Sequence, residues 1–192
     1  MKLIETSLPG VRLLEPSVFA DERGCFFESY NQARLKALGI TDRFVQDNHA
    51  SSAKGTLRGL HYQIEHAQAK LCRVISGEVL DVVVDIRRGS PAFGHHESAL
   101  LSAENRLQIY VPAGCAHGYL VLSDTADFVY KCSDYYYPEG ERGVAWDDPA
   151  VAIAWGIEQP LLSAKDNKLP RLAAIPPEEL PVFRQPPKLP PA

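Results

Sequence analysis

The stretch Val79-Leu-Asp-Val-Val-Val-Asp-Ile86 decides the fold class, because its side chains alternate as those of a β-strand do. Every second residue from Leu80 to Ile86 is aliphatic, whereas Asp81 and Asp85 fall on the other face. Further β-rich runs occupy 70–75, 107–111, 119–122 and 128–131, with glycine and proline between them. Many short strands separated by turn residues predict an all-β sandwich or barrel.

Only short helices are expected beside these strands. Asn31 is suited to cap a helix over Gln32–Leu38, and Gly39 is suited to end it. The segment 161–172 is a second helix candidate. The sequence predicts one domain over residues 1–175, followed by a proline-rich tail over 176–192, where 7 of 17 residues are proline. Such a tail cannot join a central strand, so we expect it to lie along the surface or fray, with docking to another protein as the alternative.

Composition excludes several classes of protein. The 192 residues carry a net charge of -4, which argues against a nucleic-acid binder held by phosphate contacts. No apolar run approaches the roughly 18 residues that span a bilayer, and the first sixteen residues do not resemble a signal peptide. Four cysteines, none in a CxxC pair, indicate reduced thiols and a cytoplasmic protein, with disulfides or a zinc site as the alternatives.

The stretch from Gly55 to Gln63 contains the first candidate for catalysis. Strand alternation would place His61 on one face with Gln63 and would place Arg58 on the other. An imidazole in a pocket is suited to act as a general base near neutral pH. The alternative is a structural histidine whose hydrogen bonds are satisfied in the core.

Two further cationic residues could join His61. Lys70 alternates with Cys72 and Val74, so it points inward if that face is the buried one and into solvent if it is not. An inward lysine would stabilise an oxyanion. The turn Pro112–Gly114 leads His117 into a strand, and the two histidines could converge inside one barrel.

These stretches resemble the two sequence boxes of the cupin jelly rolls. The boxes are Gly-x5-His-x-Gln from Gly55 and Pro-x-Gly-x2-His from Pro112. Metal-binding cupins place a second histidine at the position of Gln63, and no glutamate ligand follows, since that position falls at Ala67 or Gln68. A transition-metal site needs about three protein ligands. The resemblance therefore implies a cupin-type jelly roll that binds no metal.

Eleven ordered blocks between about residues 3 and 172 resemble the dTDP-4-dehydrorhamnose 3,5-epimerase family. They are Glu22-Arg23-Gly24-x-Phe26-x-Glu28, Gln46-Asp47-Asn48, Gly55–Gln63, Gln68-x-Lys70-Leu71, Asp81–Asp85, Ser90-Pro91-x-Phe93-Gly94, Pro112–Gly118, Tyr130-Lys131, Glu139-x-Glu141, Trp146–Pro149 and Ser163-x-Lys165-Asp166. The segment Ile64–Ala67 departs from a family stretch that is often proline-rich, so His66 is a position where substrate contacts could differ.

The resemblance implies an epimerase that inverts C3 and C5 of a dTDP-4-keto-6-deoxy sugar, through an enolate and without a cofactor. His61 resembles the base, Asp166 the carboxylate that orients it, Tyr130 the opposing acid and Lys70 the group that holds the enolate oxygen. The residues that resemble substrate-binding positions of the family are Arg23, Glu28, Gln46, Asn48, Arg58, His117, Tyr136, Glu141 and Lys165. Tyr136 matches the aromatic residue that stacks on thymine.

The family further implies a homodimer with exchanged N-terminal strands, so Arg23 and Glu28 would serve the partner's site. We expect a dTDP-sugar as the partner molecule, and neither nucleic acid nor membrane. Three alternatives stay open at this point. They are a mono-epimerase or ketone-moving relative on the same scaffold, a non-catalytic nucleotide-sugar binder, and a metal-dependent cupin oxygenase, which Gln63 disfavours.

Overall fold

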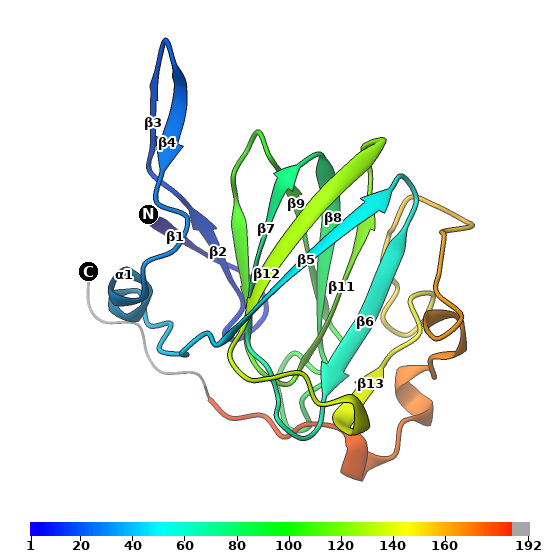
Figure 1. The fold of residues 1–192 in the computed structure, drawn as a ribbon. Coiled ribbons are helices and arrows are strands. Elements are labelled where there is room, and N and C mark those ends of the chain that lie inside the picture. Colours follow the sequence, from blue (N-terminus) through cyan, green and yellow to red (C-terminus); the bar gives the residue numbers. More distant parts are fainter. Residues whose placement is uncertain (186–192) are drawn as a thin grey trace.

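The computed structural model describes residues 1–185, whose regular structure is mostly antiparallel β-sheet (Figure 1). One sheet has the strand order β1-β2-β10-β7-β12-β5, a second has the order β13-β6-β11-β8-β9, and β3 and β4 form a separate hairpin. The strands are β1 (Lys2–Glu5), β2 (Arg12–Glu15), β3 (Val18–Asp21), β4 (Gly24–Phe27), β5 (Gln46–Ala53), β6 (Leu57–Gln63), β7 (Lys70–Ser76), β8 (Glu78–Asp85), β9 (His96–Ser102), β10 (Gln108–Val111), β11 (Cys115–Val121), β12 (Thr125–Cys132) and β13 (Glu141–Gly143). The predicted all-β fold is confirmed.

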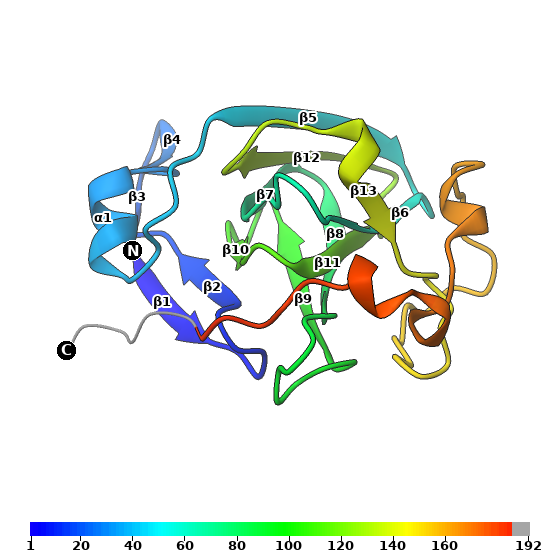
Figure 2. The ribbon, with the colours of Figure 1, turned by 90° about the horizontal axis from the view of Figure 1, so that it is seen from below.

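The two large sheets face each other, and the C-terminal segment lies outside them (Figure 2). Phe128, Tyr119 and Val83 belong to the buried cluster that holds the sheets together. A second cluster covers the other face of the five-stranded sheet, where Val82 packs with Trp155 of the C-terminal segment. The five-stranded sheet is therefore buried on both faces, which brings its polar side chains into the interior.

Strand β8 shows this double burial most clearly. The predicted alternation is present, but Asp81 and Asp85 are both fully buried. Each carboxylate has a cationic or imidazole partner, since Asp85 pairs with Arg87 at 2.7 Å and Asp81 with His117 at 2.9 Å. Buried carboxylates need such partners because desolvation disfavours their charge.

A bulge between β6 and β11 changes which residues of β6 point inward. His117 lies opposite His61, but Tyr119 lies opposite Arg58, so the register shifts by one residue around Gly59. Gly59 has φ +120°, and a Cβ there would come within 2.6 Å of the Gly118 Cα, so this close approach requires glycine. Arg58 stays exposed, but its guanidinium donates to Ser52 of β5 in the facing sheet, so it lies on the same side of β6 as His61 and the prediction that the two occupy opposite faces was wrong.

The predicted first helix is confirmed, whereas the second candidate segment contains no α-helix but only 3-10 turns. Helix α1 (Gln32–Ala37) begins after Asn31, whose side chain accepts a hydrogen bond from the Arg34 amide at 3.2 Å. The segment 161–172 contains only the short 3-10 turn η2 (Asp166–Lys168) and the start of η3 (Leu172–Ala174). Leu169 precedes a proline and has ψ 140°, which ends the turn, because the residue before proline disfavours the helical region.

The C-terminal segment beyond residue 175 is described as far as residue 185. After η4 (Pro177–Glu179), the amide of Arg88 donates to the Pro181 carbonyl at 2.7 Å, and the Phe183 amide donates to the Arg88 carbonyl at 2.9 Å. This part lies against the body of the protein. The division into a domain and a tail stays a prediction, and the rest of the predicted tail falls outside the described residues. The remaining short element is η1 (Pro138–Gly140), before β13.

Candidate active site

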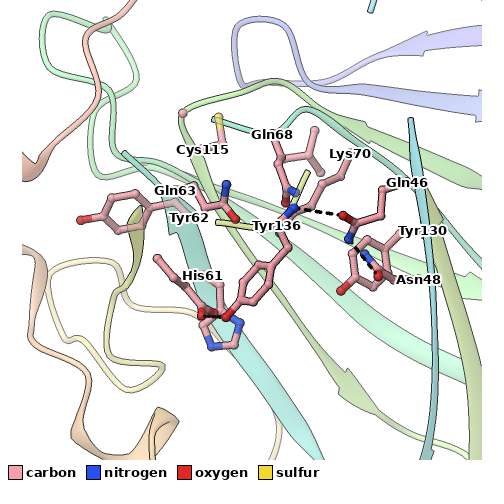
Figure 3. A pocket seen from close by; sticks show the side chains of 13 residues that line it. Gln46, Asn48, His61, Tyr62, Gln63, Gln68, Lys70, Cys115, Tyr130 and Tyr136 are labelled. Atoms are coloured by element: carbon pink, nitrogen blue, oxygen red, sulfur yellow. Dashed lines mark hydrogen bonds between the residues drawn. The ribbon is translucent and has the colours of Figure 1, made fainter. Parts of the chain in front are cut away.

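A cavity of about 250 Å³ opens between the two large sheets (Figure 3). The six-stranded sheet lines it with Gln46, Asn48, Lys70 and Tyr130. The five-stranded sheet lines it with His61, Gln63 and Glu141. Tyr136, from the connection between β12 and β13, reaches towards His61 across the cavity (Figure 3). The structure therefore brings together residues that lie up to 95 positions apart, from Gln46 to Glu141.

His61 and Asp166 form a close pair at this cavity. The Nε2 atom of His61 lies 2.6 Å from a carboxylate oxygen of Asp166, a charge-assisted distance. Burial alone would raise the pKa of Asp166, but hydrogen bonds from His61, Ser163 and the Gly59 amide, with the imidazole charge, outweigh it and lower that pKa. Asp166 is therefore an anion that fixes the ring and leaves Nδ1 as the nitrogen that can accept a proton.

Lys70 and Tyr130 approach the cavity from the opposing sheet. Lys70 points inward on the same face as the buried Cys72 and Val74, so the inward alternative for this strand is correct. The ammonium lies 5.8 Å from the centre of the Tyr130 ring. Burial, reinforced by the neighbouring cysteines, raises the pKa of Tyr130, so its hydroxyl remains protonated and can donate a hydrogen bond.

A chain of polar contacts closes one edge of the cavity. The hydroxyl of Tyr136 donates to Glu141 at 2.5 Å, and Glu141 also forms an ion pair with Lys165. Burial would raise the pKa of Glu141, but these two partners lower it. On the other side, Gln46 donates to the Asn48 side chain at 3.1 Å. All five side chains are among the predicted binding residues.

Two predicted binding residues, Arg58 and His117, are not among the residues that line the cavity. His117 is buried, with its Nε2 atom 2.9 and 3.0 Å from the two carboxylate oxygens of Asp81. Arg58 donates to the Ser52 hydroxyl at 3.1 Å. Arg58 is exposed, whereas His117 lies directly opposite His61 in the ladder between β6 and β11.

Arg23 and Glu28 do not reach the cavity of their own chain. Arg23 lies at the turn of the β3–β4 hairpin, which projects from the body (Figure 1), and its side chain is 85% exposed. It pairs with Asp21 at 3.1 Å through Nε. Glu28 pairs with Arg34 of α1 at 3.2 Å.

Sequence reasoning gave no role in the site to two glutamines that line the cavity, Gln63 and Gln68. The alternation that places Gln63 on the face of His61 was a signal for the first of them. Over residues 1–185, no three His, Cys, Asp or Glu side chains gather so that they could hold a metal ion. Within the same range, no helix is long and apolar enough to cross a membrane.

A histidine–carboxylate pair, a lysine and a tyrosine around one cavity define the class of protein as an acid–base enzyme with a jelly-roll scaffold. Comparisons with known proteins identify the family. Residues 5–174 match the dTDP-4-dehydrorhamnose 3,5-epimerase family. The chain therefore belongs to this family, and the predicted family membership is confirmed.

Individual relatives support the same assignment. The dTDP-4-dehydrorhamnose 3,5-epimerase of Pseudomonas aeruginosa is 54% identical over 170 residues, which cover 88% of this chain and 94% of that protein. The Neisseria gonorrhoeae enzyme of the same name is 55% identical over 168 residues, which are 86% of this chain and 51% of that longer protein.

A solved structure confirms the cupin-like fold. The dTDP-6-deoxy-D-glucose-3,5-epimerase of Legionella pneumophila, in complex with dTDP-4-keto-L-rhamnose, is 50% identical and superposes with a TM-score of 0.92. The match covers 95% of this chain and 98% of that chain. The two chains thus share the same jelly roll over almost their whole length.

Proposed function

We propose that this protein inverts C3 and C5 of dTDP-4-dehydro-6-deoxy-D-glucose to give dTDP-4-dehydro-L-rhamnose, a step in dTDP-L-rhamnose biosynthesis. The observation that carries the proposal is that His61 and Tyr130 line one cavity from opposing sheets. Inversion requires that a proton leaves one face of a carbon and returns to the other. A base and an acid on opposite walls supply the two faces.

His61 is the base in this proposal. Both carbons flank the C4 ketone, so their protons are acidified, and Nδ1 of His61 takes one of them as the C–H electrons move into the enolate. Asp166, at 2.6 Å from Nε2, keeps the neutral ring in the tautomer that leaves Nδ1 unprotonated. It also stabilises the imidazolium that forms, as the carboxylate of a catalytic triad does.

Lys70 and Tyr130 complete the reaction. The ammonium of Lys70 stabilises the negative charge that develops on the C4 oxygen, and its partly enclosed position strengthens that interaction. The hydroxyl of Tyr130, kept protonated by its raised pKa, returns a proton to the enolate from the face opposite His61. Each inverted carbon loses one proton and gains one, so the product is an isomer of the substrate and no redox step is needed.

The other predicted binding residues would hold the nucleotide end. Tyr136 offers a half-exposed ring on which thymine can stack. Lys165 lies beside Glu141 at the edge of the cavity, where a diphosphate would pass. Metal and cofactor independence remain predictions, which rest on the use of Gln63 at a cupin ligand position.

The hairpin supports a homodimer with exchanged N-terminal segments. Phe19 and Phe26 are 68% and 73% exposed on it, and large exposed aromatic side chains mark interaction surfaces. In this proposal the hairpin packs on a second copy and brings Arg23 and Glu28 to the partner's cavity. A cytoplasmic location remains a proposal, supported by four free cysteines in the described part of the chain.

The test is proton NMR of dTDP-4-dehydro-6-deoxy-D-glucose with the purified protein in deuterated water. Deuterium at both C3 and C5, with the L-rhamno product, is the expected result. Deuterium at one carbon alone would replace the proposal by a mono-epimerase. Deuterium at neither carbon, with substrate bound, would leave a nucleotide-sugar binder.

A further inference from the structure

The main chain around Tyr136 is held by three glutamine side chains from different parts of the fold. Gln46 of β5 accepts a hydrogen bond from the Tyr136 amide at 3.0 Å. Gln63 of β6 accepts from the Tyr137 amide at 3.2 Å. Gln68, just before β7, donates to the Asp134 carbonyl at 2.8 Å. The segment 134–137 lies outside the regular strands, so these side-chain contacts take the place of the backbone hydrogen bonds that fix a strand in a sheet.

Gln63 has a second set of contacts that makes it a cross-link. Its amide nitrogen donates to the His66 carbonyl at 2.7 Å, within the loop between β6 and β7. The His66 ring contacts both Asp134, at 3.2 Å, and the Tyr137 ring, whose centre lies 5.1 Å away. Gln63 therefore joins two loops at the edge of the cavity, and both ends of its amide are used.

Burial makes these contacts of Gln63 energetically significant. Its side chain is only 7% exposed, so an unpaired amide would lose hydrogen bonds without gaining water. Gln63 also lines the cavity next to His61 on the same strand. Because both its polar atoms are paired with the main chain of loops, it has none free to take part in proton transfer.

We propose that Gln63 and Gln68 are positioning residues that set the affinity for the nucleotide end of the substrate. They fix the main chain of residues 134–137 and thereby the ring of Tyr136, leaving the chemistry at the sugar to other groups. This inference rests on the proposed role of Tyr136 as the platform for the base. It gives a function to the residue that stands at a metal-ligand position of other cupins.

The test is a double-mutant cycle with dTDP as the probe, measured by calorimetry on the full chain. Gln63→Met keeps the shape of the side chain and removes its hydrogen bonds. We expect it to weaken dTDP binding on the order of tenfold, with kcat at saturating substrate within about threefold and KM raised. If Gln63 acts through Tyr136, adding Gln63→Met to Tyr136→Ala should weaken binding no further.

Asn105→Leu is the matched control. The Asn105 amide also bridges main-chain groups, donating to the Leu100 carbonyl at 2.9 Å and accepting from the Leu107 amide at 3.0 Å, in a loop that does not line the cavity. It should leave dTDP affinity unchanged, which separates positioning from general loss of stability.

Three results would overturn the inference. Additive effects of Gln63→Met and Tyr136→Ala would show that Gln63 does not act through Tyr136, as would a fall in kcat with unchanged dTDP affinity. Unchanged affinity in Tyr136→Ala alone would remove the platform itself. The double-mutant cycle measures binding, so its outcome does not depend on turnover. A parent protein that binds dTDP without epimerising the sugar would refute the proposed reaction, and the cycle would still test this inference.

Discussion

Replacing Asp166 with asparagine tests how much of the reaction depends on the pair at the base. The 2.6 Å contact joins His61 to a carboxylate that is 5% exposed, so it is charge-assisted and poorly screened. A hydrogen bond to a charged group contributes about 1.5–3 kcal/mol, which corresponds to roughly a ten- to hundredfold loss of rate. The asparagine amide can in addition donate to Nε2, which places the ring proton on Nδ1 and blocks the base.

The two effects together predict a fall in kcat of about 10³- to 10⁴-fold for Asp166→Asn, as for a triad in the wrong tautomer. The assay is the NMR time course of product formation, with thermal unfolding to show that the variant folds. Asp148→Asn is a matched control, because Asp148 is equally buried and accepts from the Leu172 amide at 2.6 Å, away from the cavity. Turnover of Asp166→Asn within tenfold of the parent would refute the role of the pair.

Three further predictions follow from the same geometry. Tyr130→Phe should retain exchange of substrate protons with deuterated water but lose C5 inversion. Lys70→Ala should lose exchange and inversion together, because the enolate itself becomes costly. Equal losses of exchange and inversion in Tyr130→Phe, or full C5 inversion in that variant, would contradict the role of Tyr130 as the acid. Asp85→Asn should lower the free energy of unfolding, measured in urea at pH 7, by about 3–5 kcal/mol, because it leaves the buried Arg87 without its counter-charge; a loss below 1 kcal/mol would count against this. Burial opposes ionisation of Asp85, but the contacts with Arg87 and Ser90 lower its pKa, so the stability from this ion pair should be present above pH 4 and be lost as the pH falls further. Prolonged chelation should leave turnover unchanged, and a stoichiometric transition metal whose removal stops the reaction would overturn metal independence.

Local pattern in the sequence accounts for the strands in the middle of the chain and for the first helix. Alternation predicts β8, and the Asn31 cap predicts α1, because both depend on neighbours within a few residues. Alternation alone leaves the orientation of Lys70 undecided, since both faces of its strand contain apolar residues. The packed sheets settle the question by burying Cys72 and Val74 on the same side.

Features that depend on close contact between distant segments could not be predicted from local pattern. The bulge at Gly59 exists because β11 approaches at Gly118, and it moves Arg58 to the face of His61. Asp166 lies 105 residues beyond His61, so only the resemblance to a family pointed to their pairing. The hydrogen bond from the Tyr137 amide to Gln63 likewise joins two segments that meet only in the folded protein.

The most direct test of the account is position-resolved deuterium exchange by His61→Asn, beside the parent protein. One base that serves both carbons predicts that exchange at C3 and at C5 falls at least a hundredfold, while dTDP affinity and thermal unfolding stay close to those of the parent. Exchange at either carbon within tenfold of the parent rate would contradict the assignment of His61 as the base.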